Sequence, residues 1–133
     1  MPGLARAVQN GNELKEEVAR IGQELGLRVF EEVEVGKRLW GARRRIDVIL
    51  RHPETRQTLG IECKYQAVPG TAQEKIPATV QDILAWPIPG LVVFAGEGFS
   101  SDMRSYLYAT GKAIELEDLA VWLELFFGLD LSS

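Results

Sequence analysis

The sequence of 133 residues contains a single cysteine, Cys63, and a single histidine, His52. One cysteine excludes an internal disulfide and a zinc site built from several cysteines. No apolar run approaches the length of a membrane-spanning helix, and the N-terminus lacks the basic and then apolar pattern of a signal peptide. We therefore predict a cytoplasmic protein that does not insert into a membrane.

Positive charge is in the minority, with 15 lysines and arginines against 19 acidic residues and a formal net charge of −4. This balance argues against a protein that simply coats nucleic acid. Residues 37–56, however, include seven basic and two acidic side chains, a local balance of +5, whereas residues 115–130 include five acidic side chains and no basic ones. The basic stretch suits contact with a phosphate backbone. A solvated hairpin end with scattered arginines explains it equally well.

The most informative stretch is residues 43–66, with the sequence RRRIDVILRHPETRQTLGIECKYQ. Two runs of strand character flank a segment with turn chemistry, which contains the histidine and a proline. If the chain folds back about Glu54 and Thr55, residues whose numbers sum to 109 face each other. Asp47 then lies opposite Glu62.

Side chains alternate between the two faces of a strand, so this hairpin sorts its residues into two sets. We expect one face to be a core surface and the other to carry two carboxylates and an amine. Cys63 falls on the core face, where a small buried thiol is the simplest interpretation. The polar face contains Arg45, Asp47, Gly60, Glu62, Lys64 and Gln66, and the apolar face contains Ile46, Val48, Leu50, Leu59, Ile61, Cys63 and Tyr65.

Two carboxylates a few ångströms apart repel each other unless a cation lies between them or one takes up a proton. Oxygen ligands of this kind suit Mg²⁺ or Mn²⁺, with water in the remaining positions. Lys64 lies two residues beyond Glu62, roughly 6–7 Å along the strand. There it can orient or deprotonate an attacking water, or stabilise charge on a phosphate. Asp47, Glu62 and Lys64 are therefore a plausible set for hydrolysing a phosphodiester.

The pattern Ile46-Asp47, fourteen intervening residues and Glu62-Cys63-Lys64 resembles the motif of the PD-(D/E)XK nuclease superfamily. That group includes many restriction endonucleases and archaeal Holliday-junction resolvases. The resemblance implies that Asp47 and Glu62 bind the metal and that Lys64 positions the nucleophilic water. Ile46 stands where the motif has a proline, which the family often lacks.

Five further residues are candidates for supporting roles. The resemblance implies a glutamate on the first helix near the metal, for which Glu17 is the candidate. It also implies that a glutamine or lysine from the helix after the hairpin holds substrate or water, here Lys75 or Gln81. Arg45 and Gln66 share the polar face of the hairpin. For Glu17, Lys75 and Gln81, an exposed position without a role is the alternative.

The pattern along the chain predicts a loose lead-in over residues 1–11 and a single domain over residues 12–133. Trp40, in the connection before the hairpin, covers core or stacks on a base. Before the hairpin we expect a helix over 12–25 capped by Asn12 and a strand over 27–35 with Val29 and Val33 on one face. After it we expect a helix over 77–86 that buries Val80, Ile83 and Leu84, and then a strand over 91–95. A helix to 109, capped by Ser100 or Ser101, buries Met103, Tyr106 and Leu107, and it is followed by a strand over 112–115 and a helix over 117–131.

This order predicts an α/β fold with a mixed central sheet flanked by helices. It also matches the αβββαβ core of the restriction endonuclease-like fold that the resemblance implies. The last helix, over residues 117–131, is apolar on more than one face. Either it is sandwiched in the core, or its excess apolar surface meets a second subunit. We predict a homodimer formed through this region.

We predict a Mg²⁺- or Mn²⁺-dependent endonuclease, a hydrolase acting on nucleic acid and on DNA more than RNA. The alternative is a non-catalytic module of the same fold that binds nucleic acid or supports assembly, with Glu62 and Lys64 joined in a structural ion pair. The acidic pI of about 5.1 fits that alternative. A third interpretation, a small-molecule phosphoesterase, has no distinctive motif behind it.

Overall fold

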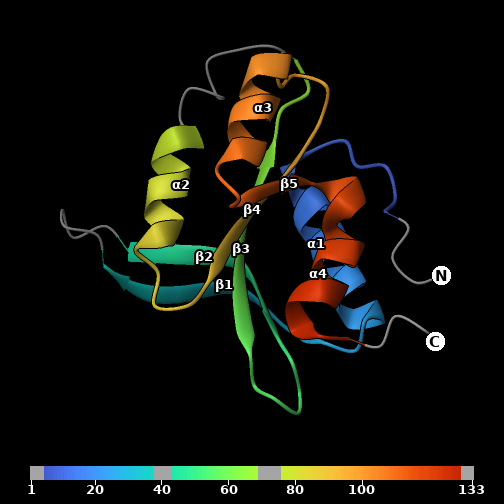
Figure 1. The fold of residues 1–133 in the computed structure, drawn as a ribbon, viewed down its shortest axis with the longest axis vertical. Helices are drawn as coiled ribbons and strands as arrows, with labels where there is room; N and C mark the ends of the chain where they lie inside the picture. The colour runs from blue at the N-terminus through green and yellow to red at the C-terminus, as the bar shows by residue number, and fades with distance from the viewer. Residues whose placement is uncertain (1–4, 38–42, 69–75, 130–133) are drawn as a thin grey trace.

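The protein is built on a five-stranded mixed sheet with two helices on each face (Figure 1). The computed structural model describes residues 5–37, 43–68 and 76–129. The predicted α/β fold with an αβββαβ core is confirmed. The elements in chain order are α1 (Gly11–Glu24), β1 (Arg28–Lys37), β2 (Arg43–Arg51), β3 (Thr58–Tyr65), α2 (Ile76–Leu84), β4 (Gly90–Ala95), α3 (Ser101–Ala109), β5 (Ala113–Glu115), the 3₁₀ turn η2 (Leu116–Asp118) and α4 (Leu119–Phe127).

The strands lie in the order β1-β2-β3-β4-β5, the first three antiparallel and the last three parallel. Within the hairpin, Val48 pairs with Ile61, so the predicted register, in which paired numbers sum to 109, is confirmed. In the turn, Nδ1 of His52 accepts hydrogen bonds from the amides of Glu54 and Thr55 at 3.1 and 3.2 Å. The histidine is a turn residue, as predicted.

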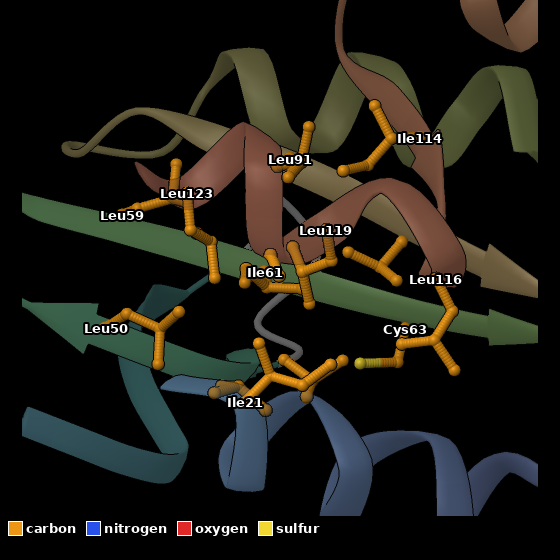
Figure 2. Packing of buried hydrophobic residues seen from close by; sticks show 14 of the residues in the cluster. Ile21, Leu50, Leu59, Ile61, Cys63, Leu91, Ile114, Leu116, Leu119 and Leu123 are labelled. Atoms are coloured by element: carbon orange, nitrogen blue, oxygen red, sulfur yellow. The ribbon is translucent and has the colours of Figure 1, made fainter. Parts of the chain in front are cut away.

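Each face of the sheet carries its own hydrophobic core. The first core lies under α1 and α4, where Ile21, Leu119 and Leu123 converge on Ile61 of β3 (Figure 2). The second core lies under α2 and α3 and is built around Phe94 of β4. Because β4 is covered on both faces, residues 91–94 are all buried, as expected of a central strand.

The alternation of side chains breaks at one step of the β1–β2 pair. Val48 belongs to the first core, whereas Ile46, two residues earlier on the same strand, belongs to the second. In β1, Val29 packs against the first core and Val33 against the second. Glu32 lies at this step with a left-handed backbone, φ +54°. The prediction that Val29 and Val33 share one face is therefore wrong, and so is the prediction that Ile46 and Val48 do. Strict alternation assumes extended backbone throughout, and Glu32 departs from it.

The predicted polar face of the hairpin is also partly a core surface. Ile49 belongs to the second core, and a Cβ on Gly60 would come within 2.8 Å of the Trp86 ring. The reason is that helices cover both faces of this sheet, so only the strand ends are free for polar groups. The carboxylate and amine of Glu62 and Lys64 lie at such an end.

The first helix is capped by Asn10 and not by Asn12. The Asn10 side chain accepts a hydrogen bond from the amide of Glu13 at 2.8 Å, and the Glu13 carboxylate accepts one from the amide of Gln9 at 3.1 Å. The acid three residues after the cap thus accepts from the amide just before the cap, an arrangement similar to a capping box. Asn12 has Lys15 at that position, so the choice of Asn12 was wrong.

Three further details of the helices differ from the sequence prediction. In α2 the buried stripe is Ile76, Val80 and Ile83, spaced by four and three residues, and Leu84 is exposed. In α3 Leu107 is buried and Tyr106 is exposed. The last helix ends at Phe127 because Gly128 adopts a left-handed cap with φ +66°.

None of the described helices is long and apolar enough to cross a membrane.

The capping assignment predicts unequal effects of two neighbouring substitutions. Asn10→Ala removes the side-chain acceptor and should lower the free energy of unfolding by about 1 kcal/mol. Asn12→Ala replaces an exposed helix residue and should change it by less than about 0.5 kcal/mol. Urea unfolding followed by circular dichroism compares the two. Equal losses, or a larger loss for Asn12→Ala, would contradict the assignment.

Candidate active site

Asp47 is held between two strands by its own side chain. The last backbone pair of the β2–β3 ladder is Val48 with Ile61, and beyond it the Asp47 Oδ2 atom accepts a hydrogen bond from the Cys63 amide at 2.9 Å. A carboxylate oxygen thus replaces a backbone carbonyl as the acceptor for a buried amide. The interaction fixes the side chain of Asp47 beside the strand that carries Glu62.

The other oxygen of Asp47 faces a lysine of the first helix. Lys15 Nζ lies 3.4 Å from Asp47 Oδ1 and 3.0 Å from Glu32 Oε1. Glu32 Oε2 in turn lies 3.5 Å from Arg45 Nη1, so acids and bases alternate across α1, β1 and β2. The hydrogen bond to Glu32 raises the pKa of Lys15 and outweighs the opposing effect of burial. Lys15 is therefore a fixed positive charge beside Asp47.

Glu62 and Lys64 complete the cluster from β3. Their charged atoms, Oε1 and Nζ, are 3.9 Å apart, and side-chain exposure is 13% for Asp47, 20% for Glu62 and 37% for Lys64. Burial, and then the nearby carboxylate of Asp47, raise the pKa of Glu62 to about 8. Without a cation, Glu62 therefore retains a proton at neutral pH because two adjacent carboxylates cannot both ionise cheaply.

The donor set fits a hard divalent cation. Asp47 and Glu62 supply carboxylate oxygens, and within the described parts of the chain no group of three or more His, Cys, Asp or Glu side chains could hold a metal. Mg²⁺ is bound through one or two carboxylates and retains several waters, so two carboxylates are sufficient. Burial and then the neighbouring carboxylate of Asp47 raise the pKa of Glu62, and a bound cation would offset both effects.

Cys63 lies between the two site residues of β3 and takes no part through its side chain. Its thiol is buried in the first core, as the sequence predicts. Burial, followed by the charges of Asp47 and Glu62, raises the pKa of this thiol well above its usual value. A protonated, buried thiol is unreactive.

Glu17, the candidate from the first helix, is not brought to the acids. Residues two apart on a helix point about 200° apart, so Glu17 faces away when Lys15 reaches Asp47. The Glu17 carboxylate is buried and accepts hydrogen bonds from Arg20 Nη2 and the amide of Arg6, each at 2.6 Å. Burial acts to raise its pKa, but these hydrogen bonds outweigh that effect and lower it. Here the glutamate is part of an ion pair that ties residues 5–10 to α1.

Gln66 lies one residue beyond β3 and is nearly fully buried. Its Nε2 donates to the carbonyl of Gly98 at 2.9 Å, and the amide of Gly98 donates to the Gln66 carbonyl at 2.8 Å. Gly96 is required in the same turn because a Cβ there would come within 2.2 Å of the Gln66 carbonyl oxygen. Gln66 therefore ties the end of β3 to the turn after β4.

The remaining candidates lie apart from the acids or outside the described residues. Arg45 is exposed and pairs with Glu32 and Glu34, on the β1 side of the cluster. Gln81 is exposed on α2, with no contact to the acid pair among the residues that the structure describes. Lys75 and Trp40 lie outside the described residues.

Two residues of the cluster, Lys15 and Glu32, were missed from the sequence. Lys15 directly follows Leu14 of the buried stripe, a border position from which a long side chain can reach inward, and this was the available signal. Glu32 gave none, because a left-handed backbone at a glutamate cannot be read from residue type.

Comparison with known proteins places this geometry in a family. The family model described as PD-(D/E)XK nuclease superfamily domain matches residues 6–124. The crystal structure of a protein of unknown function, AF1548, aligns with 80% of this chain and 58% of its own, with a TM-score of 0.55 and 20% sequence identity. At that identity the likeness shows the fold alone. No curated protein matches the chain.

The family match contains all five elements from α1 to α2 that carry or cover Asp47, Glu62 and Lys64, as well as β4, α3 and β5. The resemblance seen in the hairpin motif is thereby confirmed. The chain belongs to the PD-(D/E)XK nuclease superfamily.

Proposed function

We propose that this protein is a divalent-metal-dependent nuclease that hydrolyses phosphodiester bonds, acting on DNA more than on RNA. The observation that carries the proposal is the convergence of Asp47, Glu62 and Lys64 at the diverging end of β2 and β3. Family membership supports a nuclease-like domain.

Asp47 and Glu62 would hold Mg²⁺ or Mn²⁺. The ion, when bound, lowers the pKa of a coordinated water and polarises the phosphoryl oxygen. Asp47 is already oriented by the Cys63 amide, so little side-chain ordering remains to be done on binding. In the metal-free protein a proton neutralises the Glu62 carboxylate, and Glu62 must release this proton when the cation binds.

Lys64 would act on the water and the phosphate. Its ammonium lies next to Glu62 and is more exposed than either acid, so it can donate hydrogen bonds to an attacking water or to a phosphoryl oxygen. In hydrolysis the attacking water gives up a proton to solvent as its oxygen bonds to phosphorus, the bond to the leaving oxygen breaks, and the leaving oxygen takes up a proton from solvent. Lys64 would stabilise the negative charge that develops on the phosphoryl oxygens.

The non-catalytic module is the competing proposal, and it requires the Glu62–Lys64 contact to be a structural ion pair. At 3.9 Å the pair is too long for a charge-assisted hydrogen bond, and Lys64 is the more exposed partner. A pair built for stability would be shorter. The geometry therefore favours a lysine that is available to a ligand.

The nuclease proposal predicts metal-dependent cleavage that both Asp47→Ala and Lys64→Ala reduce by at least about 100-fold. The loss follows because one substitution removes a metal ligand and the other removes the charge beside the phosphate. The assay uses single-stranded, duplex, flapped and four-way-junction DNA, together with RNA, each with Mg²⁺ or Mn²⁺.

Lys112→Ala is the matched control, since Lys112 lines a separate pocket of about 330 Å³ with Trp86 and Pro87 and should leave cleavage unchanged. If folded wild-type protein cleaves no substrate while still binding nucleic acid, the non-catalytic module is the better description.

The raised pKa of Glu62 predicts that metal binding depends on pH. Because its pKa is raised in the fold, protonated Glu62 contributes to the stability of the metal-free protein at low pH. This contribution to the free energy of unfolding is lost as the pH rises through the folded pKa of about 8. Because the metal displaces that proton, Mn²⁺ affinity should rise about tenfold per pH unit from pH 6 to 8 and then level off. Calorimetric titration in buffers of different ionisation enthalpy measures affinity and proton release together. Glu62→Gln should bind weakly without this slope, and a flat wild-type profile would contradict the assignment.

We also propose that the protein forms a homodimer through the outer face of α4. Val121 and Leu125 are 57% and 68% exposed there, while Leu119 and Leu123 fill the first core. Leu125→Arg should convert a dimer to a monomer, as measured by light scattering after size exclusion. Leu84→Arg, an equally apolar exposed position on α2, is the control that should leave the mass unchanged. A wild-type protein that is monomeric at high micromolar concentration would contradict the proposal.

A further inference from the structure

Asp47 stands between two other acids, one on each neighbouring strand. Glu62 on β3 interacts with it on one side, and Glu32 on β1 lies across from it through Lys15. The contact with Cys63 leaves each oxygen of Asp47 with lone pairs that are free for further bonds. A single carboxylate is thus shared between two acidic neighbours.

The two sides of Asp47 differ in what neutralises them. On the Glu62 side, no described cation lies as close to Asp47 as Lys15 does on the other side. On the Glu32 side, Lys15 Nζ bridges the two carboxylates at 3.0 and 3.4 Å. An ammonium in this position supplies a positive charge and donates hydrogen bonds, but it cannot coordinate water or phosphate oxygens as a metal ion does.

The bridge is built into the fold. Lys15 is fixed by α1, whose neighbouring residues Leu14 and Val18 are fully buried, so the helix cannot rotate without losing core contacts. Glu32, in the middle of β1, itself adopts the left-handed backbone conformation. Such a conformation in a glutamate is unfavourable and persists where the surroundings impose it, often at functional sites. Three elements, α1, β1 and β2, therefore cooperate to bring Glu32, Lys15 and Asp47 together.

Phosphodiester hydrolases of the two-metal kind place their ions about 3.5–4 Å apart. In this protein a shared carboxylate, Asp47, has one outer acid on each side, Glu62 and Glu32. Each outer acid forms a pair of carboxylates with Asp47, and in the pair with Glu32 the Lys15 ammonium lies between the two carboxylates. A second divalent ion there would meet both steric exclusion and repulsion from the ammonium.

We propose that Lys15 is a positioning residue of the metal site, which occupies the second-cation position between Glu32 and Asp47 and restricts the site to one divalent ion. The inference rests on the proposed function, because it requires Asp47 and Glu62 to bind a metal. It goes beyond that function by assigning a one-ion site and the residue that enforces it.

The test counts bound ions without using activity. Titration with Mn²⁺, with the free ion followed by electron paramagnetic resonance, should give one ion per wild-type chain. Lys15→Gln retains length and loses charge, and it should bind two. Lys15→Arg should bind one, as should Lys112→Gln, which removes a positive charge elsewhere. In the double variant with Lys15→Gln and Glu32→Gln, the count should return to one, because the outer ligand of the second ion is gone.

One ion on folded Lys15→Gln, or two ions on the wild type, would overturn the inference while leaving the proposed function intact. No specific Mn²⁺ binding by the wild type would instead overturn the proposed function, and this inference with it. Circular dichroism and thermal unfolding establish that each variant is folded. If Lys15→Gln does not fold, Lys15→Met, which retains the apolar stem against the helix, gives the same count.

Discussion

The hydrogen bond from the Cys63 amide to Asp47 is the interaction on which the candidate site depends. It joins β2 to β3 just past the point where their backbone pairing ends, so the two strands diverge while their acids stay together. The left-handed Glu32 in β1 makes this possible, because the β1–β2 pair changes the faces of its side chains at that step. On strict alternation Asp47 would share a face with Ile49, which belongs to the second core.

A second constraint is electrostatic. Burial of Glu62 beside Asp47 disfavours two ionised carboxylates, and two features of the structure offset this cost. On one side Lys15 is the counter-ion of Asp47, and on the other Glu62 retains a proton that the proposed cation would displace. The proposed metal binding, its pH dependence and the one-ion limit all follow from this asymmetry. Lys64, the most exposed of the three residues, is the one proposed to contact the phosphate.

Local sequence rules were sufficient to predict much of the fold and the pairing of the two acids. The hairpin register, the juxtaposition of Asp47 and Glu62 and the element order follow from period-two alternation and turn chemistry, and family motif spacing agreed with them. The position of Glu17 was not obtainable in this way, because a helix with a broad apolar stripe does not reveal its rotation against the sheet. The Lys15 bridge depends on that rotation and on a backbone conformation at Glu32 that no residue pattern announces.

The C-terminal region illustrates a similar limit. The apolar excess of its last helix was evident from sequence, but a one-dimensional pattern could not say which residues the sheet would cover. In the fold, Leu119 and Leu123 are buried while Val121 and Leu125 remain exposed, and the left-handed Gly128 ends the helix. The same ambiguity explains Leu84 of α2, which lies one position outside the buried stripe.

Anomalous diffraction from crystals soaked in Mn²⁺ tests the central claim most directly. The account predicts one anomalous peak per chain, bound by carboxylate oxygens of Asp47 and Glu62, with Lys15 still in contact with Asp47. A peak elsewhere in the molecule with none between these two acids would contradict it, as would a pair of ions in which one replaces the Lys15 ammonium.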